Sequence, residues 1–307
     1  MKSLQVFESV KKIPEGANVT ASRWIFKFKR NSTDEIIKIK SRLVAKGYTQ
    51  QEGIDFHETF SPTLKLDSIR IFTALAVQNN FQIHQIDINA AYLNAPLKEE
   101  IYMKPLKGHE DYNKKYWKLR KAIYGFKQSG KQWNDELDKY IKKIGYKRII
   151  NEPCLYSKRN KHNKICSILA VYVDDILLAG ERVEIENTKK LIKERFKIKG
   201  TGKVNFIIGI KFKHKNGYFL NQSRYAEEIL EKFGMKNSVP SRNTKPILDE
   251  DLRKNKIDKT KYRSAIRNLL YLAISTGYHV FCWKGCKKIK GSQSRRLGKC
   301  TENTQIP

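Results

Sequence analysis

Two adjacent carboxylates, Asp174 and Asp175, are the residues of this sequence whose type and spacing best suit catalysis. They interrupt an otherwise almost wholly apolar run from Ile165 to Gly180, with β-branched and aromatic residues on both sides. This pattern predicts two short buried strands joined by a turn that carries both acids. Burying a charge is costly unless it is paired or binds a metal, and neighbouring carboxylates repel each other. A hard divalent cation, most naturally Mg²⁺, would stabilise the pair.

A third carboxylate, Asp87, lies in a similar setting upstream. It belongs to the alternating segment Phe81–Ile88, which predicts a strand, and small residues follow it. Three acids on neighbouring strands could hold two metal ions, the arrangement that polymerases use for in-line phosphoryl transfer. The alternative is that Asp174-Asp175 is only a turn, because Asp is common in turns.

The motif Tyr172-Val-Asp-Asp175, with Asp87 upstream, resembles the palm of a reverse transcriptase. Four longer segments, in order and at the family's spacing, resemble the copia-type (Pseudoviridae-like) LTR retrotransposon enzyme: Ser41-Arg-Leu-Val-Ala-Lys-Gly-Tyr-Thr-Gln50, Phe60-Ser-Pro-Thr63, Asp87-Ile-Asn-Ala-Ala-Tyr-Leu-Asn94 and Ala122-Ile-Tyr-Gly-Phe-Lys-Gln128. The resemblance extends from about Trp24 to about Thr276. It implies an α+β fold of the right-hand polymerase type, with fingers, an antiparallel-sheet palm and a partial thumb.

The resemblance also implies an activity, that of the RNA-directed DNA polymerase domain of a Pol polyprotein. Asp87, Asp174 and Asp175 would be the catalytic residues and the ligands of two Mg²⁺ ions, for which Mn²⁺ could substitute. One ion would activate the primer 3′-hydroxyl, and the other would bind the triphosphate and the leaving pyrophosphate. The expected partners are an RNA template, a DNA primer, deoxynucleoside triphosphates and the remaining Pol regions, ribonuclease H and integrase, which have no counterpart in this sequence.

Six residues are assigned by the resemblance to the incoming triphosphate: Arg42, Lys46, Tyr92, Tyr124, Gly125 and Lys127. Arg42 and Lys46 lie in and after a predicted basic hairpin, whose pattern is also typical of a solvated edge strand. Tyr92 lies where the family has an aromatic residue that packs beneath the deoxyribose and would clash with a 2′-hydroxyl; the alternative is an ordinary buried tyrosine. Gly125 would let the backbone approach a ligand closely. Lys199 matches a palm lysine, although basic residues crowd its surroundings.

The formal net charge of +31 is the dominant global property of the chain. A field of this sign favours a polyanion, and nucleic acid is the polyanion that it fits best. No long apolar span or basic amphipathic anchor indicates a membrane partner. Five cysteines without paired spacing indicate a reducing compartment, and the N-terminus lacks an apolar signal region. We therefore expect an intracellular protein, in a cytoplasmic particle or the nucleus, that is not secreted.

The sequence predicts four regions: an N-terminal extension (1–20), fingers and palm (21–235), a partial thumb or connection (236–276) and a divergent tail (277–307). The tail segment Gly277–Cys300 contains no Asp or Glu and three of the five cysteines, which favours a frameshifted or truncated end. The intact acids argue for an active polymerase. The altered end argues for the alternative, a decayed and inactive retroelement fragment that retains only nucleic-acid binding.

Overall fold

The structure is a computed structural model that describes residues 4–30, 35–214, 218–238 and 258–276. The chain divides into two compact units, Met1–Asn205 and Phe206–Pro307, and each is described by itself. Both units combine helices with sheets that are mostly antiparallel, as the predicted α+β class requires; the one parallel pair of strands in the described residues is β2 (Val19–Thr20) with β6 (Pro96–Met103). The right-hand arrangement of subdomains stays a prediction. The predicted tail, 277–307, lies outside the described residues.

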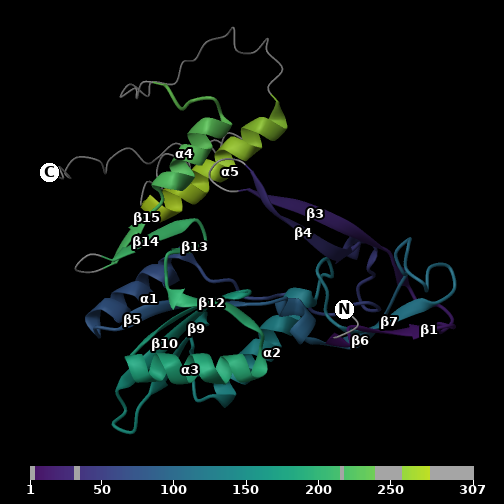
Figure 1. The fold of residues 1–307 in the computed structure, drawn as a ribbon, viewed down its shortest axis with the longest axis horizontal. Coiled ribbons are helices and arrows are strands. Elements are labelled where there is room, and N and C mark those ends of the chain that lie inside the picture. Colours follow the sequence, from purple (N-terminus) through teal and green to yellow (C-terminus); the bar gives the residue numbers. More distant parts are fainter. Residues whose placement is uncertain (1–3, 31–34, 215–217, 239–257, 277–307) are drawn as a thin grey trace, which may run out of the picture. The chain divides into compact units, whose positions relative to one another are not determined.

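A six-stranded antiparallel sheet is the centre of the first unit (Figure 1). Its strands, in spatial order, are β12 (Ile198–Lys203), β5 (Gln82–Ile88), β11 (Asp175–Gly180), β10 (Ile165–Tyr172), β9 (Glu152–Arg159) and β8 (Lys147–Ile149). The two strands predicted around the acid turn are confirmed as β10 and β11, and β5 confirms the predicted strand before Asp87. Because β10 and β11 are apolar on both faces, the sheet has to be covered by helices on both sides.

Three helices provide this cover. The helices α2 (Ser129–Lys143) and α3 (Arg182–Arg195) lie on one face of the sheet, and α1 (Leu66–Gln78) lies on the other (Figure 1). On α2, the apolar residues Trp133, Leu137 and Ile141 recur every four residues and are almost wholly buried. This spacing places them on one side of the helix, and that side packs into the core of the unit.

A polar network is buried in the same unit, between β10 and α3. The Tyr146 hydroxyl makes hydrogen bonds to Ser167 Oγ (2.8 Å) and Thr188 Oγ1 (2.9 Å), and Ser167 Oγ donates to the carbonyl of Ala179 (2.9 Å). Burial raises the pKa of Tyr146 far above its ordinary value, so this residue stays neutral. Each group is hydrogen-bonded, as buried polar groups must be if they are not to destabilise the fold.

A second sheet includes two short strands from the region 1–20, which the sequence predicted to be an N-terminal extension. Its strands, in spatial order, are β1 (Phe7–Val10), β7 (Tyr116–Lys121), β6 (Pro96–Met103) and β2 (Val19–Thr20). Val6 is fully buried with Trp117 and Leu119, and Ser9 Oγ donates to the Asp111 carboxylate (2.6 Å). The N-terminal residues are therefore part of the folded unit. The apolar pattern of two such short strands is too brief to predict from sequence.

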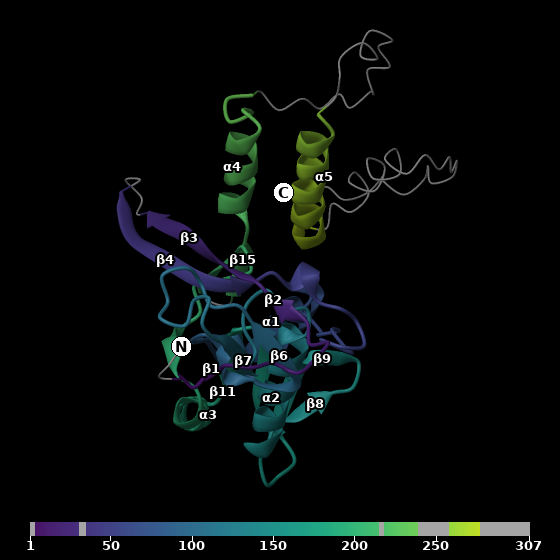
Figure 2. The ribbon, with the colours of Figure 1, turned by 90° about the vertical axis from the view of Figure 1, so that its right-hand side faces the viewer.

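The predicted basic hairpin is confirmed as β3 (Ser22–Arg30) paired with β4 (Ile36–Ala45). Figure 2 shows the two strands running side by side along their length. A short 3₁₀ helix, η2 (Gly47–Thr49), follows β4, and another, η3 (Ala91–Asn94), follows β5.

The second unit contains three short strands and two helices within its described residues: β13 (Phe206–Ile207), β14 (Ile210–His214), β15 (Tyr218–Asn221), α4 (Ser223–Lys232) and α5 (Lys259–Thr276). The strands β14 and β15 pair with each other in antiparallel register, and residues 215–217 between them lie outside the described residues. The rings of Tyr225 and Tyr271 pack edge to face, 4.9 Å apart. In the described part of the chain, no helix is long and apolar enough to cross a membrane.

Candidate active site

The turn that carries the acids is strained and is held from two sides. Val173 has a positive φ of +53°, a region that β-branched residues rarely adopt. The indole Nε1 of Trp133 donates to the carbonyl of Val173 (2.7 Å), and the backbone N–H of Ile88 donates to the carbonyl of Asp174 (2.8 Å). Strain of this kind persists only where the surroundings impose it. The buried helix α2 and strand β5 therefore fix the backbone position of Asp174.

Asp87 lies between the strand that begins with Asp175 and the strand that carries Lys199. Within the sheet, Asp87 on β5 is directly opposite Asp175 on β11 and directly opposite Lys199 on β12. Gln85 Nε2 donates to Asp175 Oδ1 (3.0 Å). Burial raises the pKa of Asp175; the hydrogen bond from Gln85 opposes this shift, and the charges of Asp174 and Asp87 add to it. The three carboxylates thus lie close enough to repel each other, and the hydrogen bond from Gln85 offsets only part of the effect on Asp175.

A pocket of about 640 Å³ opens beside the acid turn. It is lined by residues of β3, β4, β5 and β12 and of the turns between strands: Trp24, Lys40, Ser41, Arg42, Leu43, Asp87, Ile88, Asn89, Ala90, Leu93, Ile123, Tyr124, Asp174, Lys197 and Lys199. Two of the three predicted acids, Asp87 and Asp174, share this pocket with several cations, whereas Asp175 does not line it. An array of this composition can bind a metal ion together with a polyanion.

The oxygen donors of the pocket fit Mg²⁺. Mg²⁺ is usually held in proteins by one or two carboxylates, with substrate phosphates and water completing its shell, and Asp87 and Asp174 supply two carboxylates. Among the residues that the structure describes, no three acidic, His or Cys side chains converge as a complete metal cage. Two carboxylates alone would leave most of the coordination shell of a bound Mg²⁺ to other ligands.

Two tyrosines that were assigned to the nucleotide pack against each other near the acids. The rings of Tyr92 and Tyr124 lie 4.6 Å apart, and Arg42 Cζ lies 5.4 Å from the centroid of the Tyr124 ring. Tyr124 lines the pocket, whereas Tyr92 lines a neighbouring cavity of about 130 Å³ together with Val173. Burial, and next the charge of Asp174, raise the pKa of both tyrosines, so both remain neutral hydrogen-bond donors at physiological pH.

Gly125 allows its own backbone to lie directly against the backbone of Ala45. Its φ is +101°, and a Cβ at this position would lie 2.2 Å from the carbonyl oxygen of Ala45. A Cβ on Gly47 would likewise lie 2.0 Å from the carbonyl oxygen of Gly125. The two glycines let two segments of backbone touch. The sequence pattern predicted an approach to a ligand, and the contact in the structure is with the end of β4.

The two remaining lysines assigned to the nucleotide do not line the pocket. Lys127 Nζ lies 4.5 Å from the centroid of the Phe56 ring and donates to the carbonyl of Gln50 (3.5 Å). The backbone N–H of Lys46 donates to Ala21 (2.8 Å), and its side chain is absent from the pocket lining. Arg42 and Tyr124 thus line the same pocket as Asp87 and Asp174, whereas Lys46 and Lys127 do not.

Two further lysines line the pocket: Lys197, which sequence analysis did not single out, and Lys199, which the resemblance matched to a palm lysine. Lys199 reaches it because β12 pairs with β5, and the carbonyl of Lys197 accepts a hydrogen bond from the Asn89 backbone (2.8 Å). The resemblance did single out Lys199, but the many lysines around it hid its significance. Both lysines are placed by contacts between segments that are distant in sequence: Lys199 by the register of β12 against β5, and Lys197 by its hydrogen bond to Asn89.

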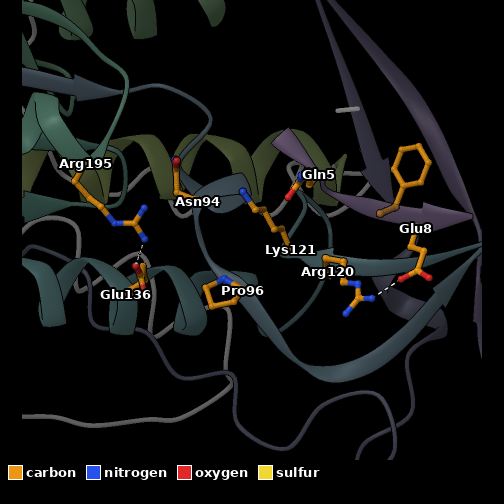
Figure 3. Close-up of a pocket in the computed structure, with 9 residues that line it drawn as sticks. Gln5, Glu8, Asn94, Pro96, Arg120, Lys121, Glu136 and Arg195 are labelled. Carbon is orange, nitrogen blue, oxygen red and sulfur yellow. Dashed lines mark hydrogen bonds and ion pairs between the residues drawn. The ribbon is translucent and has the colours of Figure 1, made fainter. Parts of the chain in front are cut away.

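A second pocket, also of about 640 Å³, lies along β1 and β7 (Figure 3). Its charged residues are largely paired with each other: Arg120 with Glu8, and Arg195 with Glu136 at 2.6 Å. It contains none of the three predicted acids.

Comparison with known proteins defines the class. Residues 5–249 match the family described as reverse transcriptase (RNA-dependent DNA polymerase). Because this match covers most of the chain, the chain belongs to that family.

Within this class, the chain is similar to Pol polyproteins of copia-type transposons. The Pol polyprotein of transposon TNT 1-94 from Nicotiana tabacum is 35% identical over 295 residues, which cover 90% of this chain and 22% of the relative. That of transposon RE2 from Arabidopsis thaliana is 35% identical over 269 residues, covering 85% and 18%. The Ty1-H Gag-Pol polyprotein of Saccharomyces cerevisiae is 29% identical over 288 residues, covering 85% and 15%. The chain thus spans less than a quarter of each relative, and the predicted resemblance is confirmed.

Replacing Asp175 with Asn is expected to stabilise the protein at neutral pH in the absence of divalent metal. A raised pKa means that the folded state disfavours the charged form, so the associated stability is present at low pH and is lost as pH rises through the folded pKa. Asn keeps the oxygen that accepts from Gln85 and removes the charge. Melting temperatures measured with chelator should show Asp175→Asn above wild type at pH 7, with the gap closing towards pH 4. An equal gap at both values would contradict this origin.

Proposed function

We propose that this chain is the catalytic domain of an RNA-directed DNA polymerase that extends a DNA primer on an RNA template by two-metal phosphoryl transfer. The observation that carries this proposal is the shared pocket, in which Asp87 and Asp174 lie with Arg42, Lys197 and Lys199. The carboxylates suit the metal, and the cations suit the triphosphate that accompanies it. The family membership supports the same reaction.

In this proposal, the described residues divide the work. Asp87 and Asp174 would hold Mg²⁺, or Mn²⁺ in its place, and the bound metal would stabilise negative charge on the reacting phosphate. Asp175, which is directly opposite Asp87 in the sheet, would add to the negative charge beside them. Arg42, Lys197 and Lys199 would bind the triphosphate oxygens, because guanidinium and ammonium groups donate strong hydrogen bonds to phosphate. Tyr92 would exclude a 2′-hydroxyl, and Tyr124 would orient the nucleotide against Arg42.

The proposal also assigns the parts of the fold. The β3–β4 hairpin would be the fingers, the six-stranded sheet with its three helices would be the palm, and α4 and α5 would begin the thumb. The short strands β13 to β15 would support the primer.

Primer extension with the purified chain tests this function directly. A DNA primer annealed to an RNA template, with deoxynucleoside triphosphates and Mg²⁺, should be lengthened, and chelator should stop the reaction. Binding of the same duplex without extension would favour the alternative, a decayed fragment that retains only nucleic-acid binding. Asp174→Asn serves as the matched control, because a contaminating polymerase would extend equally in both preparations.

The β3–β4 hairpin has two chemically different faces that suit a nucleic-acid partner. In the antiparallel register, Phe26 pairs with Ser41 and Phe28 with Ile39, while Lys27 pairs with Lys40. Alternation along each strand therefore puts aromatic and aliphatic side chains on one face and cations on the other. Phe26 is 62% exposed and Phe28 is 51% exposed. The exposed aromatic face offers a platform on which unpaired bases can stack, and the cations of the opposite face add to the positive field that attracts phosphates.

Loss of the aromatic platform is expected to weaken binding to a template with an unpaired overhang. Stacking contributes about 1–3 kcal/mol per base, so Phe26→Ala with Phe28→Ala should lower affinity for an overhanging duplex by at least roughly tenfold and leave a blunt duplex unaffected. Fluorescence anisotropy measures both. Ile25→Ala, on the other face of the same strand, is the matched control. Equal loss for blunt and overhanging duplexes would remove the hairpin's aromatic face from template contact.

A further inference from the structure

Two glutamine side chains form a buried amide pair between segments that are far apart in sequence. Gln50, just after η2, is 5% exposed, and Gln128, just before α2, is fully buried. Gln50 Nε2 donates to Gln128 Oε1 (3.1 Å). An amide pair in such a setting must be satisfied at its remaining atoms, because unpaired buried polar groups are costly.

The remaining atoms of the pair bind main chain on either side. Gln50 Oε1 accepts from the backbone N–H of Lys127 (2.9 Å), and Gln128 Nε2 donates to the carbonyl of Asp55 (2.7 Å). The Asp55 carboxylate in turn accepts from Gln51 N (2.8 Å) and Asn18 Nδ2 (2.5 Å). Loss of either glutamine therefore leaves several buried partners unsatisfied at once.

Next to this network is a seam, the direct backbone contact between residues 45–47 and residues 124–125. The Ala45 N–H donates to the carbonyl of Tyr124 (2.8 Å), and Gly47 and Gly125 permit the contact described above. On one side of this seam is β4, which carries Arg42. On the other is the loop that carries Tyr124. Both side chains line the pocket of Asp87 and Asp174.

We propose that Gln50 and Gln128 are positioning residues for the nucleotide pocket, and this inference rests on the proposed polymerase function. Neither residue lines the pocket, so neither is expected to touch substrate. Together they fix the loop 124–128 against the chain that leaves β4, and so they set the spacing between Arg42 and Tyr124. A misplacement of about 1 Å in such a pair can cost roughly 100-fold in rate.

A second buried hydrogen-bond network in the same unit can serve as a control, because breaking it should affect stability but not the position of the pocket residues. The buried network of Tyr146, Ser167 and Thr188 has similar hydrogen bonds in the same unit, but none of its members lines the pocket. Ser167→Ala should therefore lower the melting temperature without changing how nucleotide is used. The glutamine variants should do both.

The experiment is a double-mutant cycle. Gln50→Met, Gln128→Met and the double variant are compared with wild type and Ser167→Ala for melting temperature, KM for deoxynucleoside triphosphate, kcat and the Kd of primer–template. We expect each glutamine variant to raise the nucleotide KM by roughly tenfold or more, with primer–template Kd unchanged and the double variant close to either single one, because both break one network.

Several outcomes would overturn the inference. Unchanged nucleotide KM in folded glutamine variants, or an equal rise in Ser167→Ala, would reduce the pair to a stability role. Additive effects of the two substitutions would show that they do not act as one network. If wild type fails to extend any primer, the polymerase proposal fails; equilibrium binding of a deoxynucleoside triphosphate in the presence of Mg²⁺ and primer–template still tests the pair, since weaker binding in both variants supports it and equal binding refutes it.

Discussion

Asp174→Asn is expected to abolish primer extension while leaving primer–template binding almost unchanged. The substitution keeps the size of the side chain and removes the charge that a metal ion requires. Metal ions supply several kcal/mol of transition-state stabilisation, and each 1.36 kcal/mol corresponds to tenfold in rate. Single-turnover extension should therefore fall by at least about 1,000-fold. Asp87→Asn should behave in the same way, because both carboxylates line one pocket.

The matched control for this loss is a change that leaves both pocket carboxylates in place. Lys98→Ala removes a mostly exposed cation that pairs with Asp135 at 3.5 Å, outside the pocket, and it should retain wild-type extension. Anisotropy measurements with labelled duplex would show whether the Asp174→Asn protein still binds. Extension by Asp174→Asn within tenfold of wild type would contradict the assignment of this residue to the metal.

Tyr92→Ala is expected to relax discrimination between ribonucleotides and deoxynucleotides. Tyr92 is partly buried and packs against Tyr124 and the core of the first unit, so its ring has little freedom to move aside for a larger sugar. Rejection by a packed group can be strong because protein interiors deform little. The ratio of kcat/KM for a deoxynucleotide to that for the matching ribonucleotide should drop by roughly tenfold or more, the effect of about 1.4 kcal/mol.

The competing interpretation of Tyr92 is an ordinary core residue. In that case, truncation to Ala would cost about 3–5 kcal/mol of stability and leave the sugar ratio as it was. Tyr92→Phe keeps the ring and removes only the hydroxyl, so it should retain the discrimination in the steric account. An unchanged ratio in a Tyr92→Ala protein that still extends primers would remove Tyr92 from the nucleotide site.

Local patterns predicted the parts of the fold that depend on nearby residues. The acid hairpin could be predicted because the apolar run is interrupted at one point only, and this interruption coincides with the turn between β10 and β11. The inward face of α2 could be predicted because Trp133, Leu137 and Ile141 recur at helical spacing. The pairing of β3 with β4 followed from their alternation. In each case the information lies within about 20 residues, the range over which periodicity is readable.

The parts that could not be predicted depend on contacts between distant segments. Nothing near Lys199 shows that it lies opposite Asp87, because that register is set by strand pairing across more than 100 residues. Lys127 appeared suited to a phosphate by its motif, yet its amine lies over Phe56. β1 and β2 were missed because strands of four and two residues leave too short a pattern.

The contact between Gly47 and Gly125 has a consequence for genetic suppression. The nearest obstacle to a side chain is main chain at both positions: the carbonyl oxygen of Gly125 for Gly47, and the carbonyl oxygen of Ala45 for Gly125, where Val44 Cγ1 is also 2.8 Å away. A clash with a side chain can be relieved by shortening that side chain elsewhere, but no substitution shortens a backbone carbonyl. Alanine at either position should therefore have no single-residue intragenic suppressor among its neighbours, whereas side-chain lesions in the core, such as those around Trp133, should have several.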